Sequence, residues 1–200
     1  MFKRGITREN IGEYPDAMDY FYLALSLRPN SVKTYKAIAR LSQKTKTSIN
    51  GIDFLNKASW RFPEKSEFYA IKADLYRGIK DLDNAIKEYD LALSHEGDNS
   101  EYYIKRAEIK SLKGDIQGAL NDYNGAIKYN SSNAQLYSQR AFFYFLKKNY
   151  SNAAQDYTKA IELNPKKAHY YYMLASVQKL LDDNESDVNF KKAEELGIKL

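Results

Sequence analysis

Side chains that could carry catalytic or metal chemistry are sparse in this sequence of 200 residues. It contains no cysteine, which removes disulfides, thiolate zinc sites and a cysteine nucleophile. The two histidines, His95 and His169, are too far apart in the sequence to be assumed to meet, and we interpret His95, beside Glu96, as a polar helix end. Glycine-rich phosphate loops, H-E-x-x-H and G-x-S-x-G are all missing from the sequence. We therefore expect no enzymatic activity, no metal and no cofactor.

The acidic run Asp182–Asp187 has a composition similar to that of a calcium loop. Counting from Asp182, however, puts Asp187 at the position of the required glycine and Ala193 at the position of the bidentate glutamate. The run is therefore predicted to be an acidic turn that caps the helix after it.

Charge recognition is the chemistry that residues 32–65 indicate. Four basic residues recur there at spacings of three, four and four, which places them on one face of a helix; they are Lys33, Lys36, Arg40 and Lys44. Residues 32–65 hold eight Lys/Arg against two Asp/Glu, whereas residues 66–99 hold four against eight. The basic face predicts contact with an acidic partner or a polyanion, unless it is simply the solvated side of the helix.

The elements that carry these residues repeat with a period of about 34 residues. Within each repeat, small and aromatic residues recur at spacings of three and four, which is a helical period. The first half of each repeat carries a tyrosine followed four residues later by an alanine, from Tyr35 and Ala39 to Tyr171 and Ala175. Two helices per repeat are predicted, because the second half has its own pattern: Ala17-Phe21-Ala24-Pro29, Gly51-Leu55-Ala58-Pro63, Ala85-Tyr89-Ala92-Gly97, Ala119-Tyr123-Ala126-Ser131 and Ala153-Tyr157-Ala160-Pro165.

This pattern of two helices per repeat resembles the tetratricopeptide repeat (TPR), and the resemblance covers nearly the whole chain. It implies an all-α fold, a right-handed superhelical solenoid of helix-turn-helix hairpins that forms a single array over residues 1–200. About six hairpins are predicted, at approximately residues 1–31, 32–65, 66–99, 100–133, 134–167 and 168–200.

Three hairpins depart from the family pattern. The first lacks about three residues at the start of its first helix. The second lacks the turn glycine and has Gly51 and Leu55 where the family favours alanine and an aromatic residue. The sixth fits only if one residue is deleted around Asp182–Ser186, which aligns Ala193 with Ala160. Neither end shows a polar capping helix, so the array is predicted to continue in a longer chain or to self-associate.

In TPR proteins the first helices of successive repeats line a concave groove, so the resemblance implies that their variable positions select the ligand. The predicted groove residues form a basic, an acidic and a mainly aromatic group: Lys33, Lys36, Arg40 and Lys44; Glu67, Asp74, Glu101 and Glu108; Phe142, Phe145, His169, Tyr172 and Met173. Two alternatives stay open: the acidic group neutralises the basic one, and the aromatic group packs between the last two hairpins. Tyr170 and Tyr171 are assigned to the core.

The resemblance implies a non-enzymatic scaffold or adaptor that binds a protein or peptide segment in this groove. The family's clamp for chaperone C-terminal carboxylates is not supported, because in the register that starts at Lys36 the other four places hold Arg40, Ile71, Glu101 and Lys105. A helical repeat that binds RNA or another polyanion is the alternative from a different class, although the acidic group argues against a continuous phosphate track. A segment of a larger enzyme or assembly factor is a third hypothesis.

Hydropathy bears on the compartment. The sequence contains no apolar run of roughly 18 residues and no apolar leader after its first residues, MFKRGITREN. A membrane span is therefore not expected, and a cytoplasmic location is predicted.

Overall fold

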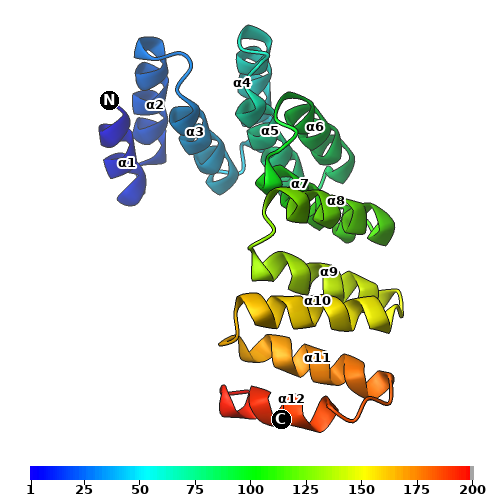
Figure 1. Cartoon of the computed structure of the whole chain (residues 1–200). Coiled ribbons are helices and arrows are strands. Elements are labelled where there is room, and N and C mark those ends of the chain that lie inside the picture. Colours follow the sequence, from blue (N-terminus) through cyan, green and yellow to red (C-terminus); the bar gives the residue numbers. More distant parts are fainter. Residues whose placement is uncertain (199–200) are drawn as a thin grey trace. The chain divides into compact units, whose positions relative to one another are not determined.

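The computed structural model describes residues 1–198, and every regular element within that range is an α-helix (Figure 1). The helices in the described range are α1 (Phe2–Asn10), α2 (Tyr14–Leu27), α3 (Val32–Lys44), α4 (Ser48–Arg61), α5 (Ser66–Gly78), α6 (Leu82–His95), α7 (Ser100–Leu112), α8 (Ile116–Tyr129), α9 (Ala134–Leu146), α10 (Tyr150–Leu163), α11 (Ala168–Leu180) and α12 (Ser186–Glu195). This confirms the predicted all-α fold.

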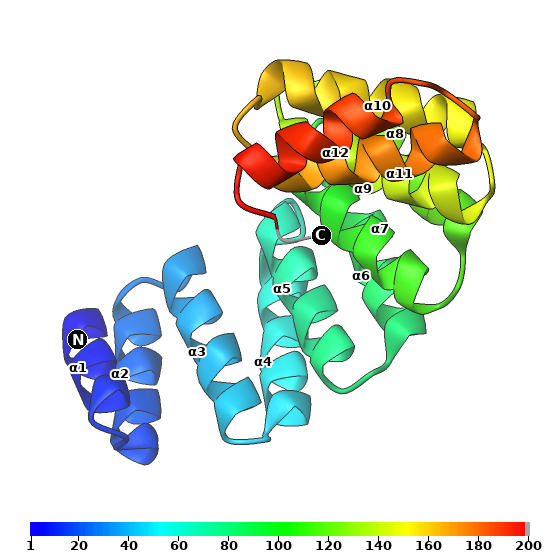
Figure 2. The ribbon, with the colours of Figure 1, turned by 90° about the horizontal axis from the view of Figure 1, so that it is seen from below.

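The chain divides into two compact units, which we call the N-terminal unit (Met1–Asp98) and the C-terminal unit (Asn99–Leu200). The N-terminal unit contains the hairpins α1/α2, α3/α4 and α5/α6, and the C-terminal unit contains α7/α8, α9/α10 and α11/α12. Figures 1 and 2 show the two helices of each hairpin joined by a short turn. The continuous right-handed superhelix over residues 1–200 stays a prediction.

The helices keep the predicted period. First helices begin at 34-residue intervals from Val32 to Ala168, and second helices begin at 34-residue intervals from Tyr14 to Tyr150. Helix α1 has 9 residues where the other first helices have 13, as the short first hairpin predicted. The sixth hairpin departs most, because α12 begins at Ser186, two residues later than the period would place it.

Small residues at the helix crossings allow close packing. Ala85, Ala119 and Ala153 are completely buried, and each lies one helical turn before a buried tyrosine of the same second helix. The one-residue deletion predicted in the sixth hairpin also holds, since Ala193 is completely buried like Ala160. These alanines therefore set the spacing between helices and carry no chemistry.

The turn inside each hairpin uses one residue in the left-handed region, where φ is positive. These residues recur with the period of the repeat: Gly12, Lys46, Lys80, Gly114, Lys148 and Asp182. For a residue other than glycine, the left-handed conformation costs roughly 1 kcal/mol of conformational free energy. Lys46 has φ 58° and replaces the glycine that the second hairpin lacks, so the repeat keeps its turn geometry even where the sequence signal is missing.

Polar caps and prolines fix the ends of the second helices. The side chains of Asp81, Asp115 and Asn149, which occupy the same position in successive repeats, accept hydrogen bonds from backbone N–H groups in the first turns of α6, α8 and α10. Helices α2, α4 and α10 each end two residues before a proline. These features explain why the boundaries recur so regularly.

The acidic turn after α11 is present, but the predicted side-chain cap on α12 is wrong. The N-cap residue Glu185 makes no side-chain cap hydrogen bond. Asp183 accepts hydrogen bonds instead from the Gln178 side chain at 3.0 Å and from the backbone N–H of Glu185 at 2.9 Å. The acidic side chain therefore orders the turn and ties it to α11.

Apolar side chains also remain on the surface of the helices. Trp60, the single tryptophan of the sequence, lies in the last turn of α4 and is 86% exposed. The exposed position contrasts with the aromatic residues of the crossings, because Phe21 and Phe68 in the same unit are fully buried.

Candidate functional site

The predicted basic face on α3 is exposed, but half of it is used inside the N-terminal unit. Arg40 donates two hydrogen bonds to the Glu9 carboxylate, from Nε at 2.9 Å and from Nη2 at 2.5 Å. Lys44 Nζ lies 3.3 Å from the same carboxylate. The Glu9 side chain is only 3% exposed, whereas the two cations are about half exposed. These contacts hold α1 against α3, so this part of the basic face serves the fold.

We expect acidification to loosen α1. Hydrogen bonds from Arg40 are the main reason that the pKa of Glu9 is lowered; burial opposes the shift and Lys44 assists it. Because the pKa is lower in the folded state, the stabilisation is complete above the ordinary glutamate pKa of about 4.3 and is lost as pH falls through the folded-state value. Protection factors for amide hydrogen exchange in α1, measured from neutral pH to roughly pH 3, test this.

Two variants make this prediction specific to Glu9. Glu9→Gln should give low protection of α1 at every pH, because the titrating group is gone. Glu13→Gln removes only an exposed ion pair with Arg8, so it should change the free energy of opening by no more than about 0.5 kcal/mol. Protection of α1 that does not depend on pH in the unmodified chain would contradict the prediction.

The other two residues of the basic face have different surroundings. The Lys33 ammonium lies 5.1 Å from the centre of the Phe2 ring, and Lys33 lines a hollow beside α1. Lys36 is exposed on α3. Of the four predicted basic residues, these two can meet a ligand without first breaking the contact between Glu9 and α3.

The predicted acidic group is divided between the two units. Asp74 accepts a hydrogen bond from the Tyr89 hydroxyl at 3.0 Å, and Arg77 lies 3.8 Å from it. Glu67 lies in the same unit, at the start of α5. The other two members, Glu101 and Glu108, lie on α7 of the C-terminal unit. A single acidic surface formed by all four stays a prediction.

The predicted aromatic group separates into packing residues and surface residues. The Phe145 ring packs 5.9 Å from Tyr150 within α9/α10, and the Tyr172 ring packs 5.8 Å from Phe190 within α11/α12. Both rings contact the second helix of their own hairpin. The predicted packing between the last two hairpins is seen for Phe145 and Met173, which lie against an apolar cluster formed by α9, α10 and α11. Phe142 and His169 are exposed and line a groove. Tyr170 is buried, as predicted for a core residue.

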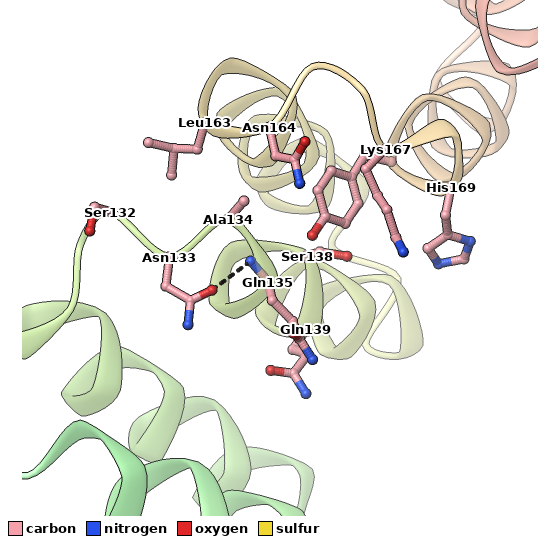
Figure 3. Close-up of a pocket in the computed structure, with 11 residues that line it drawn as sticks. Ser132, Asn133, Ala134, Gln135, Ser138, Gln139, Leu163, Asn164, Lys167 and His169 are labelled. Atoms are coloured by element: carbon pink, nitrogen blue, oxygen red, sulfur yellow. Dashed lines mark hydrogen bonds between the residues drawn. The ribbon is translucent and has the colours of Figure 1, made fainter. Parts of the chain in front are cut away.

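The groove lies in the C-terminal unit, between the starts of α9 and α11. The groove consists of two hollows, and Figure 3 shows the first, which we call the upper pocket. It has a volume of about 600 Å³ and is lined by Gln135, Ser138 and Gln139 on α9 and by Lys167 and His169 at the start of α11. Asn133 caps α9 there by accepting a hydrogen bond from the backbone N–H of Gln135 at 3.0 Å. The residues around this pocket are Ser132, Asn133, Ala134, Gln135, Ser138, Gln139, Leu163, Asn164, Lys167, His169 and Tyr170.

A second hollow of about 280 Å³ continues the same surface along α9. Ser138, Gln139 and His169 line both hollows, and the second adds Phe142 and Tyr157 among others. We call the two together the C-terminal groove. Among the described residues, no aspartate or glutamate lines either hollow, so the C-terminal groove presents amides, an exposed ring and two basic groups.

Tyr157, which lines the second hollow, offers its hydroxyl group as a hydrogen-bond donor. In the third hairpin the Tyr89 hydroxyl donates to Asp74. The corresponding positions two repeats later hold Tyr157 and Phe142, so the carboxylate acceptor is replaced by a ring. Within residues 1–198 no group accepts a hydrogen bond from the Tyr157 hydroxyl, and burial raises the pKa of this tyrosine. It therefore stays protonated at neutral pH and can donate.

Sequence reasoning missed the amides of the C-terminal groove. Gln135, Ser138 and Gln139 occupy positions of α9 that face the same way as Phe142, but the predicted groove residues of this helix are all aromatic. The signal that could have found the amides is the helix register itself, because residues three, four and seven positions apart share one face. Neutral amides at such positions suit the peptide backbone, since they can donate and accept at once.

A series of ion pairs between the two helices of a hairpin was also missed. The third, fourth and fifth hairpins each join a base in the first helix to an acid 16 residues later in the second helix. The pairs are Lys72 with Glu88, Arg106 with Asp122, and Arg140 with Asp156. All lie largely inside the protein, and their spacing could have been read from the alignment of the repeats. Their role is structural.

Neither a cluster of potential metal ligands nor a membrane-spanning helix is found among the described residues. Across that part of the chain, no three of the His, Asp and Glu residues gather in a way that could hold a metal ion. None of the helices that the structure describes is both long and apolar enough to cross a membrane.

The fold and the groove define an α-helical repeat protein. Two segments match the family model of the tetratricopeptide repeat, residues 66–98 and residues 134–167. Together with the 34-residue period of every hairpin from α3 to α10, these matches support a protein of the tetratricopeptide-repeat family. Such repeats support a role as a protein-interaction scaffold, and the TPR fold is generally not catalytic.

Solved structures of TPR proteins share the fold. The C-terminal part of a TPR repeat-containing protein from Cytophaga hutchinsonii matches 98% of this chain and 79% of its own, with TM-score 0.79 and 16% identity. The match with MamA covers 80% of this chain and 94% of MamA, with TM-score 0.71 and 19% identity. YrrB, a TPR protein with an unusual peptide-binding site, matches 88% and 92%, with TM-score 0.70 and 15% identity. No curated protein matches the chain by sequence.

Proposed function

We propose that the chain is a scaffold whose C-terminal groove binds an extended peptide segment of a partner protein. The observation that carries the proposal is the junction of the two hollows, which share Ser138, Gln139 and His169 and so form one elongated surface along α9. A solved structure with the same fold, that of YrrB, is described as having an unusual peptide-binding site. That likeness supports a peptide as the ligand class.

The chemistry of the groove suggests how the peptide is held. Gln135 and Gln139 lie one turn apart on α9 and can bond the N–H and C=O groups of an extended backbone. The half-exposed Phe142 ring offers an apolar surface for one side chain, and the almost fully buried Tyr157, which lines the same hollow, has a hydroxyl that can donate to a carbonyl. Lys167 in the upper pocket and His169 at the junction of the two hollows favour an acidic or neutral residue of the peptide there.

A peptide selected on the full chain tests the proposal. Random decapeptides displayed on phage are selected against the immobilised chain, and the strongest binder is labelled for fluorescence anisotropy. Phe142→Asp should weaken its binding at least about tenfold, because it replaces the apolar contact with a charge that the bound peptide would cover. Gln139→Ala should weaken binding less, by the value of one or two hydrogen bonds, about 1 kcal/mol.

Leu91→Asp is the matched control. Leu91 on α6 has the same exposed fraction as Phe142, 44%, but lies in the other unit. It should leave the affinity of the selected peptide unchanged. Equal affinity for the unmodified chain and for Phe142→Asp would rule out the C-terminal groove as the binding site.

A further inference from the structure

A second pocket occupies the equivalent place in the N-terminal unit. It has a volume of about 490 Å³ and lies between the start of α1, the end of α2 and the start of α3. A shift by four repeats maps most of its lining onto that of the upper pocket of the C-terminal groove. We call it the N-terminal pocket; its side chains used below are Phe2, Lys3, Leu27, Arg28, Ser31 and Lys33.

The two equivalent pockets differ in charge. Where the C-terminal groove has Gln139, Asn164 and His169, the N-terminal pocket has three bases, respectively Lys3, Arg28 and Lys33. No carboxylate of the described chain lines the N-terminal pocket. Because the two pockets occupy equivalent positions in the repeats, this difference in charge is a property of the side chains and favours a different ligand.

The three cations of the pocket are not neutralised by the acid nearest to them on α1. The Glu9 carboxylate bonds Arg40 and Lys44 instead. In the part of the chain that the structure describes, no carboxylate forms an ion pair with any of the three bases of the pocket. Like charges around one hollow repel each other, so an anion placed between them gains from all three.

Apolar groups beside the cations indicate which kind of anion fits. The Lys33 ammonium lies over the face of the Phe2 ring, and Leu27, which also lines the N-terminal pocket, is exposed. The Ser31 side chain adds a hydroxyl, which shares a hydrogen bond of 2.8 Å with Thr34. A peptide supplies an anionic side chain and an aliphatic neighbour together, whereas a phosphate ion supplies only the charge and an RNA strand pairs its charge with flat bases.

We propose that the N-terminal pocket binds an anionic residue of a peptide, with an apolar residue next to it. The anion is a carboxylate of aspartate or glutamate, or the phosphate of a phosphorylated serine or threonine; Arg28 and the two lysines recognise either group. The inference rests on the proposed function in taking a peptide as ligand, but it concerns the other unit. It makes the chain a scaffold with two binding sites of different chemistry.

The test uses three fluorescein-labelled peptides, Gly-Ser-Leu-X-Leu-Ser-Gly, in which X is phosphoserine, glutamate or serine. Anisotropy titrations with the full chain, at low and at physiological salt, should show the two anionic peptides binding at least about tenfold more tightly than the serine peptide, the effect of one good charge-assisted contact. Comparison of phosphoserine with glutamate identifies the preferred source of the anion. Equal binding of all three peptides overturns the proposal.

Exchanging side chains between the two pockets locates the site. The triple variant Lys3→Gln, Arg28→Asn, Lys33→His gives the N-terminal pocket the side chains of the C-terminal groove at these three positions and should lose the preference for the anionic peptides. Its control, Lys46→Gln, Lys57→Gln, Lys87→Gln, removes three exposed lysines of the same unit that belong neither to the pocket nor to the predicted basic face. The control should keep the preference; an equal loss in both variants means diffuse charge attraction and overturns the proposal.

Two further titrations, one with an RNA and one with the variant Phe142→Asp, distinguish a peptide site from a polyanion site and the N-terminal pocket from the C-terminal groove. A labelled oligouridylate that binds the unmodified chain as tightly as the phosphoserine peptide, and loses binding in the triple variant, identifies a polyanion site and overturns the peptide assignment. Phe142→Asp should not affect the anionic peptides. Failure of the C-terminal groove in its own test therefore leaves this result standing, and the reverse also holds.

Discussion

Asp156→Ala is expected to destabilise the fifth hairpin by about 3 kcal/mol, because it leaves the Arg140 guanidinium without its carboxylate in a largely buried position. Arg140 donates to both oxygens of Asp156 at 2.7 Å, and it also donates to Asn124 at 2.7 Å. The remaining hydrogen bond to Asn124 compensates only partly. The loss should appear as a lower urea midpoint of the full chain and as faster amide exchange in α9 and α10.

An apolar pair at the same positions of the second hairpin suggests a double variant that should restore stability lost in Asp156→Ala. The second hairpin has Ile38 and Phe54 at the positions of Arg140 and Asp156, and both belong to an apolar cluster. The double variant Arg140→Ile, Asp156→Phe copies this pair and should recover at least about 1 kcal/mol relative to Asp156→Ala, because a buried ion pair can be replaced by apolar residues with little loss.

A surface ion pair on the same helix is the control. Lys159 and Glu162 pair on α10 with both side chains about half exposed, so Glu162→Ala should change stability by less than about 0.5 kcal/mol. If Asp156→Ala were as mild as Glu162→Ala, the pair between α9 and α10 would be unimportant for stability. Amide exchange is needed beside the urea curve, because repeat proteins unfold in parts and one midpoint averages over them.

Gly5→Ala is expected to destabilise the first hairpin by about 2 kcal/mol through overpacking. A Cβ atom on Gly5 would lie 2.5 Å from Cε1 and 2.7 Å from Cδ1 of the Phe21 ring. In the following hairpin the corresponding residues are Ala39 and Leu55, which are both buried. Alanine is therefore compatible with the crossing only when the facing side chain is smaller or placed differently.

A double variant at positions 5 and 21 tests whether the clash with the Phe21 ring causes the loss of stability in Gly5→Ala. Phe21→Leu alone leaves a gap and should cost about 1 kcal/mol. Combined with Gly5→Ala it copies the pair Ala39 and Leu55, so the double variant should be more stable than the sum of the single effects by about 1 kcal/mol. Additive effects, measured by amide exchange in α1 and α2, would show that the ring moves freely away from the new methyl group.

The fold could be predicted from the sequence because each repeat tests the others. Five first helices and five second helices keep a constant spacing, so a weak hairpin such as α3/α4 is placed by its neighbours. The start of α12 could not be predicted, since a deletion in a turn shifts the register without saying which turn residue is lost. Loss of periodicity removes the information on which the prediction depends.

The surroundings of the candidate groove residues could be predicted less fully than the fold, and the reasons differ from residue to residue. Arg40 is on the predicted face, but its partner Glu9 lies 31 residues earlier and on another helix, a pairing that no repeat pattern announces. Tyr172 has the spacing of a groove residue, yet its ring meets Phe190, because the direction of a long side chain depends on the packing of the next helix. Phe142 and His169 are exposed, and their contact with a ligand stays a prediction.

The exposure of Trp60 has a practical consequence for spectroscopy. An indole that is already in water in the native state emits at long wavelength, so unfolding of the chain changes its fluorescence little. The same property makes Trp60 a reporter of association: a partner that covers the end of α4 would shift the emission to shorter wavelength. With one tryptophan in the sequence, that shift could have no other source within the chain.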